Sequence, residues 1–204
     1  MRADDDYEEL MPWQDYKTAT PICVLAVLLF LSGITIGLTT LCAFDLYKDF
    51  ALKLPTYNHS DIFLNNFGVA LPIIGALGRL AWGIAGDLLP VWMLLVIGDG
   101  MAAFLQVMMY VTRPTREVYV VVCGLLAIST GMTNMMPPVI KRVMGPENMA
   151  LNFGFVFGGE AIGCVWYVIF ISLVGGIPDA VVVWIVSIPA LVALTAAVLL
   201  VGRY

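Results

Sequence analysis

Four ionisable side chains of this sequence fall inside strongly apolar stretches: Arg79, Asp87, Asp99 and Glu160. A charge in hydrocarbon is costly, so such residues usually mark a functional site or are neutralised by a buried partner. An arginine can bind an anion and a carboxyl group can carry a proton. The chemistry open to this set is therefore anion binding, proton transfer or mutual neutralisation, and for Arg79 and Glu160 both binding and pairing remain open.

Small residues surround Arg79 and Glu160 in the sequence. Arg79 and Gly83 are four positions apart and share a helix face, while Asp87 lies about two turns beyond Arg79. Glycines let a neighbouring backbone approach closely, which predicts tight packing on both helices. The glycines that we assign to these packing motifs are Gly78, Gly83, Gly154, Gly159 and Gly163.

A second polar stretch, Ser129 to Asn134, precedes Pro137-Pro138, which should kink or end its helix. Asn134 is a candidate for contact with a bound solute. Asp99 stands between two glycines and is either a packed polar contact or a proton carrier. One histidine and four scattered cysteines supply no metal-ligand cluster or nucleophile–base pair, so the sequence predicts no enzyme, metal site or cofactor.

The composition indicates whether these residues lie in water or in a membrane. The chain has 204 residues, of which 61% are hydrophobic and 12% charged, with a mean hydropathy of +0.93. Soluble domains carry about 25% charged residues. The sequence therefore predicts an integral, multi-pass protein of the lipid bilayer, and its lack of a basic patch argues against nucleic acid as a partner.

The expected fold is an all-α membrane protein, because only helices satisfy every backbone group within single apolar segments. An acidic lead-in at 1–20 precedes a six-helix transmembrane domain at 21–204. The expected spans are 21–46, 62–86, 91–111, 117–138, 150–174 and 180–201, each long enough to cross about 30 Å of hydrocarbon.

The even number of spans puts both termini on one side, and the distribution of lysine and arginine favours the cytoplasmic or matrix side. The membrane itself stays open between the plasma membrane and an organelle inner membrane, including the mitochondrial one. Asn58-His59-Ser60 fits the glycosylation triplet, which matters only if its loop faces a secretory lumen.

The motif Gly78-Arg79-x-x-x-Gly83-x-x-x-Asp87 resembles the signature between the second and third helices of each half of the major facilitator superfamily. Trp82, the segment from Gly145 to Gly154, and the lead-in from Pro12 to Pro21 resemble the oxalate/formate antiporter and monocarboxylate transporter branch. The resemblance implies that the chain corresponds to the C-terminal six-helix half, built from two three-helix repeats. It also implies that Arg79 binds a substrate carboxylate.

The sequence departs from that family at three points. Glu160 stands where many members carry a second basic residue, which argues against a dicarboxylate and lets Arg79 and Glu160 neutralise each other. Leu88-Leu89-Pro90 replaces the basic residues that usually follow the aspartate. The family needs twelve helices, with substrate between two halves, so we expect an obligate partner: a second copy, a separate N-terminal half or a larger membrane complex.

Two functions follow as expectations. The first is a half-size transporter subunit in which Arg79, Glu160 and Asn134 bind a small monocarboxylate, and Glu160 or Asp99 carries a coupled proton. The second is a non-transporting accessory subunit of a larger assembly, such as a respiratory or photosynthetic complex, derived from a transporter half.

Overall fold

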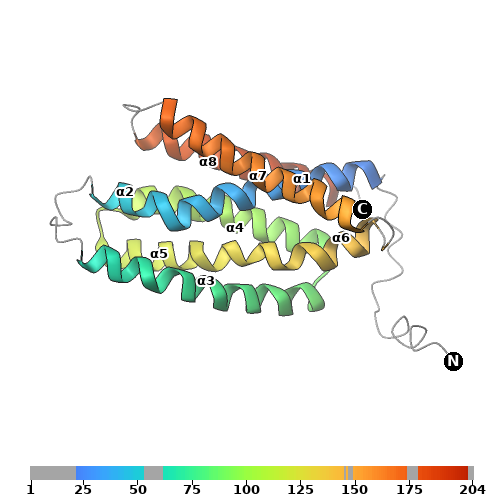
Figure 1. Cartoon of the computed structure of the whole chain (residues 1–204), viewed down its shortest axis with the longest axis horizontal. Coiled ribbons are helices and arrows are strands. Elements are labelled where there is room, and N and C mark those ends of the chain that lie inside the picture. Colours follow the sequence, from blue (N-terminus) through green and yellow to red (C-terminus); the bar gives the residue numbers. More distant parts are fainter. Residues whose placement is uncertain (1–21, 53–61, 145, 147–148, 174–178, 202–204) are drawn as a thin grey trace.

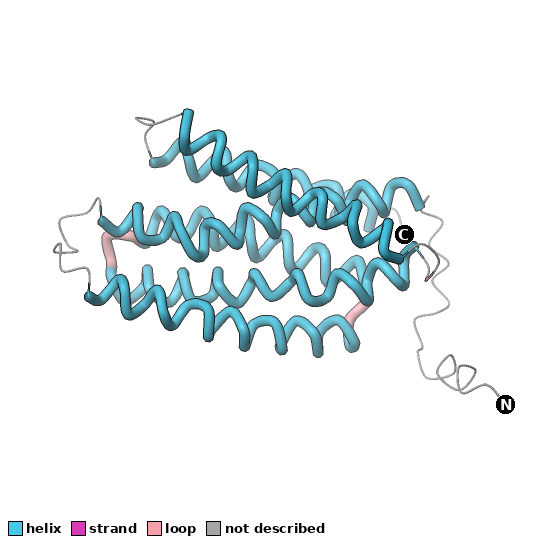
Figure 2. The backbone as a smooth tube through the Cα atoms, in the orientation of Figure 1, coloured by secondary structure: helices cyan, strands magenta, loops and turns pink. Residues whose placement is uncertain are grey.

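The computed structural model describes residues 22–52, 62–144, 146, 149–173 and 179–201, and within them the regular structure is entirely helical (Figure 1). The helices are α1 (Ile22–Leu41), η1 (Cys42–Leu46), α2 (Tyr47–Leu52), α3 (Ile62–Leu88), α4 (Val91–Thr112), α5 (Arg116–Ser129), η2 (Thr130–Met135), α6 (Met136–Met144), α7 (Met149–Leu173) and α8 (Asp179–Val201). Short links join α3 to α4 and α4 to α5 at opposite ends of the bundle (Figure 2).

Six stretches within the described residues are long and apolar enough to cross a membrane. The prediction of an all-helical chain with six membrane-length helices is therefore confirmed, and it is consistent with an integral multi-pass membrane protein. The first of these stretches ends with the π-helical turn η1, and the fourth contains the 3₁₀ segment η2 and the beginning of α6.

Two loops between helices begin further along the chain than the sequence predicts. The loop expected from Tyr47 starts with helix, because one π turn at η1 carries the first span on into α2. Lys141, expected in a loop, lies in α6, which continues to Met144. The glycosylation triplet at Asn58 and the acidic lead-in lie outside the described residues.

The fourth span changes its winding before its two prolines rather than at them. Residues Thr130–Met135 form a 3₁₀ segment, and α6 then begins at Met136 with Pro137 and Pro138 in its first turn. A proline has no N–H to donate and its ring clashes with the carbonyl four residues earlier. The preceding turns therefore use i→i+3 bonds, and the helix restarts where prolines are tolerated.

The helices pair in a pattern that repeats within the chain. The first span packs against the fifth (α1 with α7), and correspondingly the fourth packs against the second (α5 and η2 with α3). The first span also packs against the sixth (α1 with α8), and correspondingly the fourth packs against the third (α5 with α4). α4 and α8 pack against each other. Exchanging the first three spans with the last three reproduces these pairs, which fits the expected two three-helix repeats. α3 runs along one edge of the bundle, and α7 and α8 run along the opposite edge (Figure 1).

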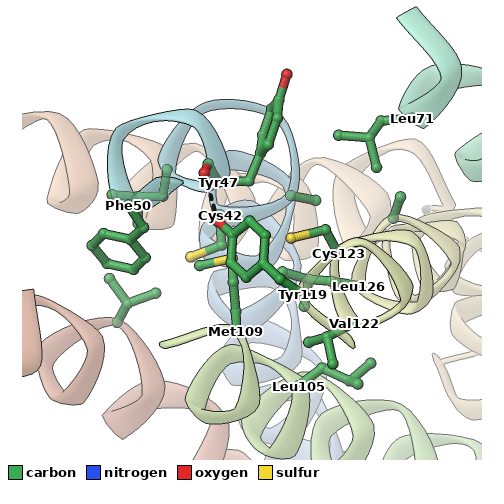
Figure 3. Packing of buried hydrophobic residues seen from close by; sticks show 14 of the residues in the cluster. Cys42, Tyr47, Phe50, Leu71, Leu105, Met109, Tyr119, Val122, Cys123 and Leu126 are labelled. Atoms are coloured by element: carbon green, nitrogen blue, oxygen red, sulfur yellow. Dashed lines mark hydrogen bonds between the residues drawn. The ribbon is translucent and has the colours of Figure 1, made fainter. Parts of the chain in front are cut away.

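The larger buried cluster draws side chains from all six spans, most of them from the first and fourth (Figure 3). The Tyr119 hydroxyl donates a hydrogen bond to the carbonyl of Tyr47, which fixes α5 to the start of α2. Cys42 and Cys123 are buried in this cluster as free thiols. A second cluster, rich in methionine, lies around Met132, Met135 and Met136.

Glycines form the two closest helix contacts. Gly33 and Gly37 of α1 face the backbone of α7, where Gly159 and Gly163 face α1 in return. Gly78 of α3 and Gly131 of η2 meet in the same way. The assignment of Gly78, Gly159 and Gly163 to packing agrees with these contacts, whereas Gly83 and Gly154 have open space beside them.

We expect Gly131→Ala to lower the stability of the bundle by about 1–3 kcal/mol, the usual cost of overpacking. A methyl group there would lie 2.5 Å from the Gly78 carbonyl carbon and 2.6 Å from the Arg79 nitrogen, and backbone cannot rotate away. Gly124→Ala is the matched control, because its methyl would meet only the Ile74 side chain at 3.9 Å. Thermal unfolding in detergent checks both. Equal melting temperatures for the two variants would contradict this packing.

Candidate functional site

An open groove of about 520 Å³ lies between α3, the η2–α6 segment and the start of α7. Its polar side chains are Arg79 and Asp87 from α3 and Thr133 and Asn134 from η2. Its apolar lining includes Phe153 and Phe157 of α7. The groove therefore brings Arg79, Gly83, Asp87 and Asn134, which the sequence separates by up to 55 positions, into one place.

Arg79 is held in position by its helix neighbours rather than by a partner of its own. The preceding Gly78 packs directly on Ile128 of α5, which brings α3 close to the fourth span. The indole N–H of Trp82 donates to the Ile128 carbonyl at 3.2 Å. Trp82 lies three positions from Arg79 and one from Gly83, so the bond of Trp82 to α5 orients the adjoining side of α3, which carries Arg79 and Gly83, toward the groove.

The α7 wall carries an aromatic pair followed by an acid. The Phe153 and Phe157 rings lie 4.1 Å apart between centroids. Glu160 follows one turn later, is half-buried and is not among the residues that line the groove. It lies close enough to Arg79 for the two charges to interact, yet within the described residues no salt bridge of 4.0 Å or less joins them. Because no salt bridge joins them, the Arg79 guanidinium and the Glu160 carboxyl group can each bind another group.

The 3₁₀ segment supplies an amide to the groove. The Thr130 hydroxyl donates to the Ala127 carbonyl at 2.7 Å, and the Thr133 hydroxyl donates to the Thr130 carbonyl at 3.1 Å. Such bonds use up the hydroxyl protons within the same helix. Asn134 is exposed in the groove, and its side-chain NH₂ is the donor best placed to supplement Arg79.

Asp87 occupies the last turn of α3 and is exposed at the end of the groove. It lies two turns from Arg79, as the sequence indicates. Its carboxylate gives the mouth of the groove a negative charge, and among the described lining residues the positive charge is that of Arg79.

Asp99 lies elsewhere. It is fully buried in α4, does not line the groove, and accepts a hydrogen bond of 2.7 Å from the Ser32 hydroxyl of α1. Seven residues further along both helices, the Gln106 amide donates to the Thr39 hydroxyl at 3.0 Å. The two bonds form a polar ladder between parallel helices. Asp99 is therefore separated from Arg79 and Glu160, with which the sequence grouped it.

We expect Ser32→Ala to destabilise the protein by about 1–3 kcal/mol, because it removes the donor to a buried carboxyl group. The other Asp99 oxygen already has no hydrogen-bond partner among the described residues. Ser187→Ala is the control: Ser187 is equally buried but its hydroxyl is unpartnered within the described residues, so its loss should cost nothing. Thermal unfolding in detergent compares the two, and an equal effect would contradict the ladder.

Sequence reasoning missed two parts of this arrangement. The aromatic pair at Phe153 and Phe157 looks like ordinary apolar helix, and only its four-residue spacing places it on one face. Gln106 was overlooked although it stands seven positions after Asp99, the spacing at which both residues return to one side of a helix.

The groove can bind one anionic group at Arg79, with an amide donor from Asn134 and a proton acceptor at Glu160. Comparisons of the chain with protein-family models, with curated proteins and with solved structures find no match.

Proposed function

We propose that this chain is a membrane transporter subunit that binds a small monocarboxylate in the groove between α3 and α7. The observation that carries the proposal is the combination of Arg79, with no ion pair among the described residues, and a half-buried Glu160 on the facing helix. A guanidinium binds a carboxylate through two parallel hydrogen bonds. An arginine in an apolar helix that is not neutralised internally is best explained by such a ligand.

The charge of the groove favours one carboxylate rather than two. Among the described residues Arg79 is the single cation that lines it, while Asp87 and the nearby Glu160 would repel a second anionic group. Phe153 and Phe157 offer an apolar surface for the remainder of a small organic acid. The resemblance of the Arg79 motif to the monocarboxylate transporter branch supports the same class.

Glu160 is the better candidate for a coupled proton. A protonated Glu160 would cease to attract Arg79, and the guanidinium would then be free for the substrate carboxylate. Proton and anion would thus enter the site together without net charge. Asp99 is fully buried and held by Ser32, so it has no comparable link to the groove.

Transport also requires a second bundle over the α3–α7 face. Only 28% of the α3 span and 17% of the α7 span are buried, against 61% in the first and fourth spans. An open polar groove in contact with lipid is unfavourable. A second six-helix bundle would enclose the groove, and rocking of the two bundles would open it to alternate sides.

Uptake of radiolabelled lactate into proteoliposomes tests the proposal. We expect saturable uptake that an acidic exterior stimulates, carried by the purified protein in its assembled state. A membrane-impermeant sugar serves as the control for leak. Absence of saturable lactate uptake from monodisperse, correctly oriented protein would refute the transporter function.

One observation favours the accessory-subunit function instead. The attraction between Arg79 and Glu160 could serve only to hold α3 and α7 in register within a larger assembly. Purification in a mild detergent discriminates the two functions. Co-migration with a large multi-subunit complex would support the accessory role, whereas a homogeneous small oligomer would support the transporter.

A further inference from the structure

The α3–α7 face carries small residues that nothing in the described structure covers. A Cβ added at Gly83, Gly154 or Gly158 would meet no atom within 4 Å. Gly154 and Gly158 are four positions apart, the spacing at which helices in membranes pack most closely against each other. Such positions prepare α3 and α7 for contact with helices that do not belong to the described bundle.

The charges on this face are related by the internal repeat. Arg79 follows Gly78, which packs on the fourth span, and Glu160 follows Gly159, which packs on the first span. The repeat exchanges the first span with the fourth and α3 with α7. Arg79 and Glu160 therefore occupy equivalent places on the two flanking helices, and they have opposite charge.

Equivalent places with opposite charges make the face complementary to itself. In an isologous dimer, residue i of one subunit contacts residue j of the other, and the reverse contact occurs as well. A two-fold axis along the membrane normal would set α3 of one copy against α7 of the second. Arg79 of each copy would then face Glu160 of the other, and all four charges would be paired.

We propose that the α3–α7 face is covered by a second copy of this chain, held by two reciprocal Arg79–Glu160 ion pairs. α3 and the second copy's α7 run antiparallel. Gly83 follows Arg79 by one turn on the same side of α3, and Phe157 precedes Glu160 by one turn on the same side of α7, so these two positions come level across the contact. The inference rests on the proposed function for the covering bundle, and protonation of the second copy's Glu160 would release Arg79 to the substrate carboxylate.

Charge reversal in trans tests the proposal. Native mass spectrometry of the wild-type protein should give twice the 22.2 kDa chain mass. Arg79→Glu and Glu160→Arg should each be monomeric, because each places like charges together at both contacts. Co-expressed with different tags, the two variants should form a heterodimer, since one chain then offers two acids and the other two arginines. Lys141→Glu, an exposed reversal on α6, is the control and should stay dimeric.

Cross-linking gives a readout that keeps all the charges. A short bismaleimide should join chains bearing Gly83→Cys to chains bearing Phe157→Cys in a mixture, because both positions lie on the contacting sides of α3 and α7, and it should join neither variant alone. A monomeric wild type, no heterodimer from the reversed variants, or no cross-link in the mixture would each overturn the proposal, and capture of a different membrane protein would name the true occupant. A dimer without lactate uptake would refute transport alone, whereas lactate uptake by an assembly that holds one copy of this chain and a different membrane protein would refute the dimer alone.

Discussion

Arg79→Gln is expected to abolish saturable lactate uptake while leaving the bundle folded. The guanidinium is the only cation that lines the groove, and no salt bridge among the described residues holds it. Truncating one partner of a buried charge pair costs about 2–5 kcal/mol. At 1.4 kcal/mol per factor of ten, apparent affinity should fall roughly 30-fold to several thousand-fold.

Two control variants show whether the loss of uptake comes from the guanidinium of Arg79 or from the loss of any positive charge. Arg79→Lys keeps the charge but loses the two parallel donors, so it should retain a reduced fraction of uptake. Lys141→Gln removes an exposed positive charge outside the groove and should transport normally. If Arg79→Gln takes up lactate with wild-type kinetics, the groove is not the substrate site.

Glu160→Gln is expected to separate lactate movement from the proton gradient. Glutamine cannot gain or lose a proton, so an acidic exterior should no longer stimulate net uptake. Exchange of lactate across the membrane without a gradient should persist, because Arg79 would still bind the carboxylate. The measurement compares gradient-driven uptake with counterflow in the same proteoliposomes.

Asp99→Asn is the matched acid-to-amide control. Its side chain can still accept the Ser32 hydrogen bond, and Asp99 does not line the groove. The variant should therefore keep the response to an acidic exterior. If Asp99→Asn loses this response and Glu160→Gln keeps it, the coupled proton is carried by Asp99 on α4 and not by Glu160 on α7.

Much of this arrangement can be predicted from the sequence, because charges and prolines stand out in apolar segments. Arg79 and Asn134 were grouped as site residues, and they line one groove. The six spans follow from the length and apolarity of their segments alone. The sequence predicts that the helix is interrupted near Pro137, but it does not say whether the 3₁₀ segment comes before or after the prolines.

The rotation of each helix is what the sequence leaves undetermined. Gly78 and Gly83 look alike in the motif, yet one packs on the fourth span and the other opens to the groove. Asp99 and Glu160 likewise both read as acids among small residues. Only the neighbours decide that Asp99 is bound to Ser32 in the interior while Glu160 lies near enough to Arg79 for their charges to interact.

Protection of a cysteine in the groove tests the central claim most directly. Gly83 lines the groove and has open space beside it, so Gly83→Cys should be tolerated. A membrane-impermeant thiol reagent should label this cysteine in liposomes, with the wild-type protein as the blank. We predict that lactate slows the labelling several-fold and that the uncharged analogue lactamide does not. Equal labelling rates with lactate, with lactamide and with neither would contradict a carboxylate site in this groove.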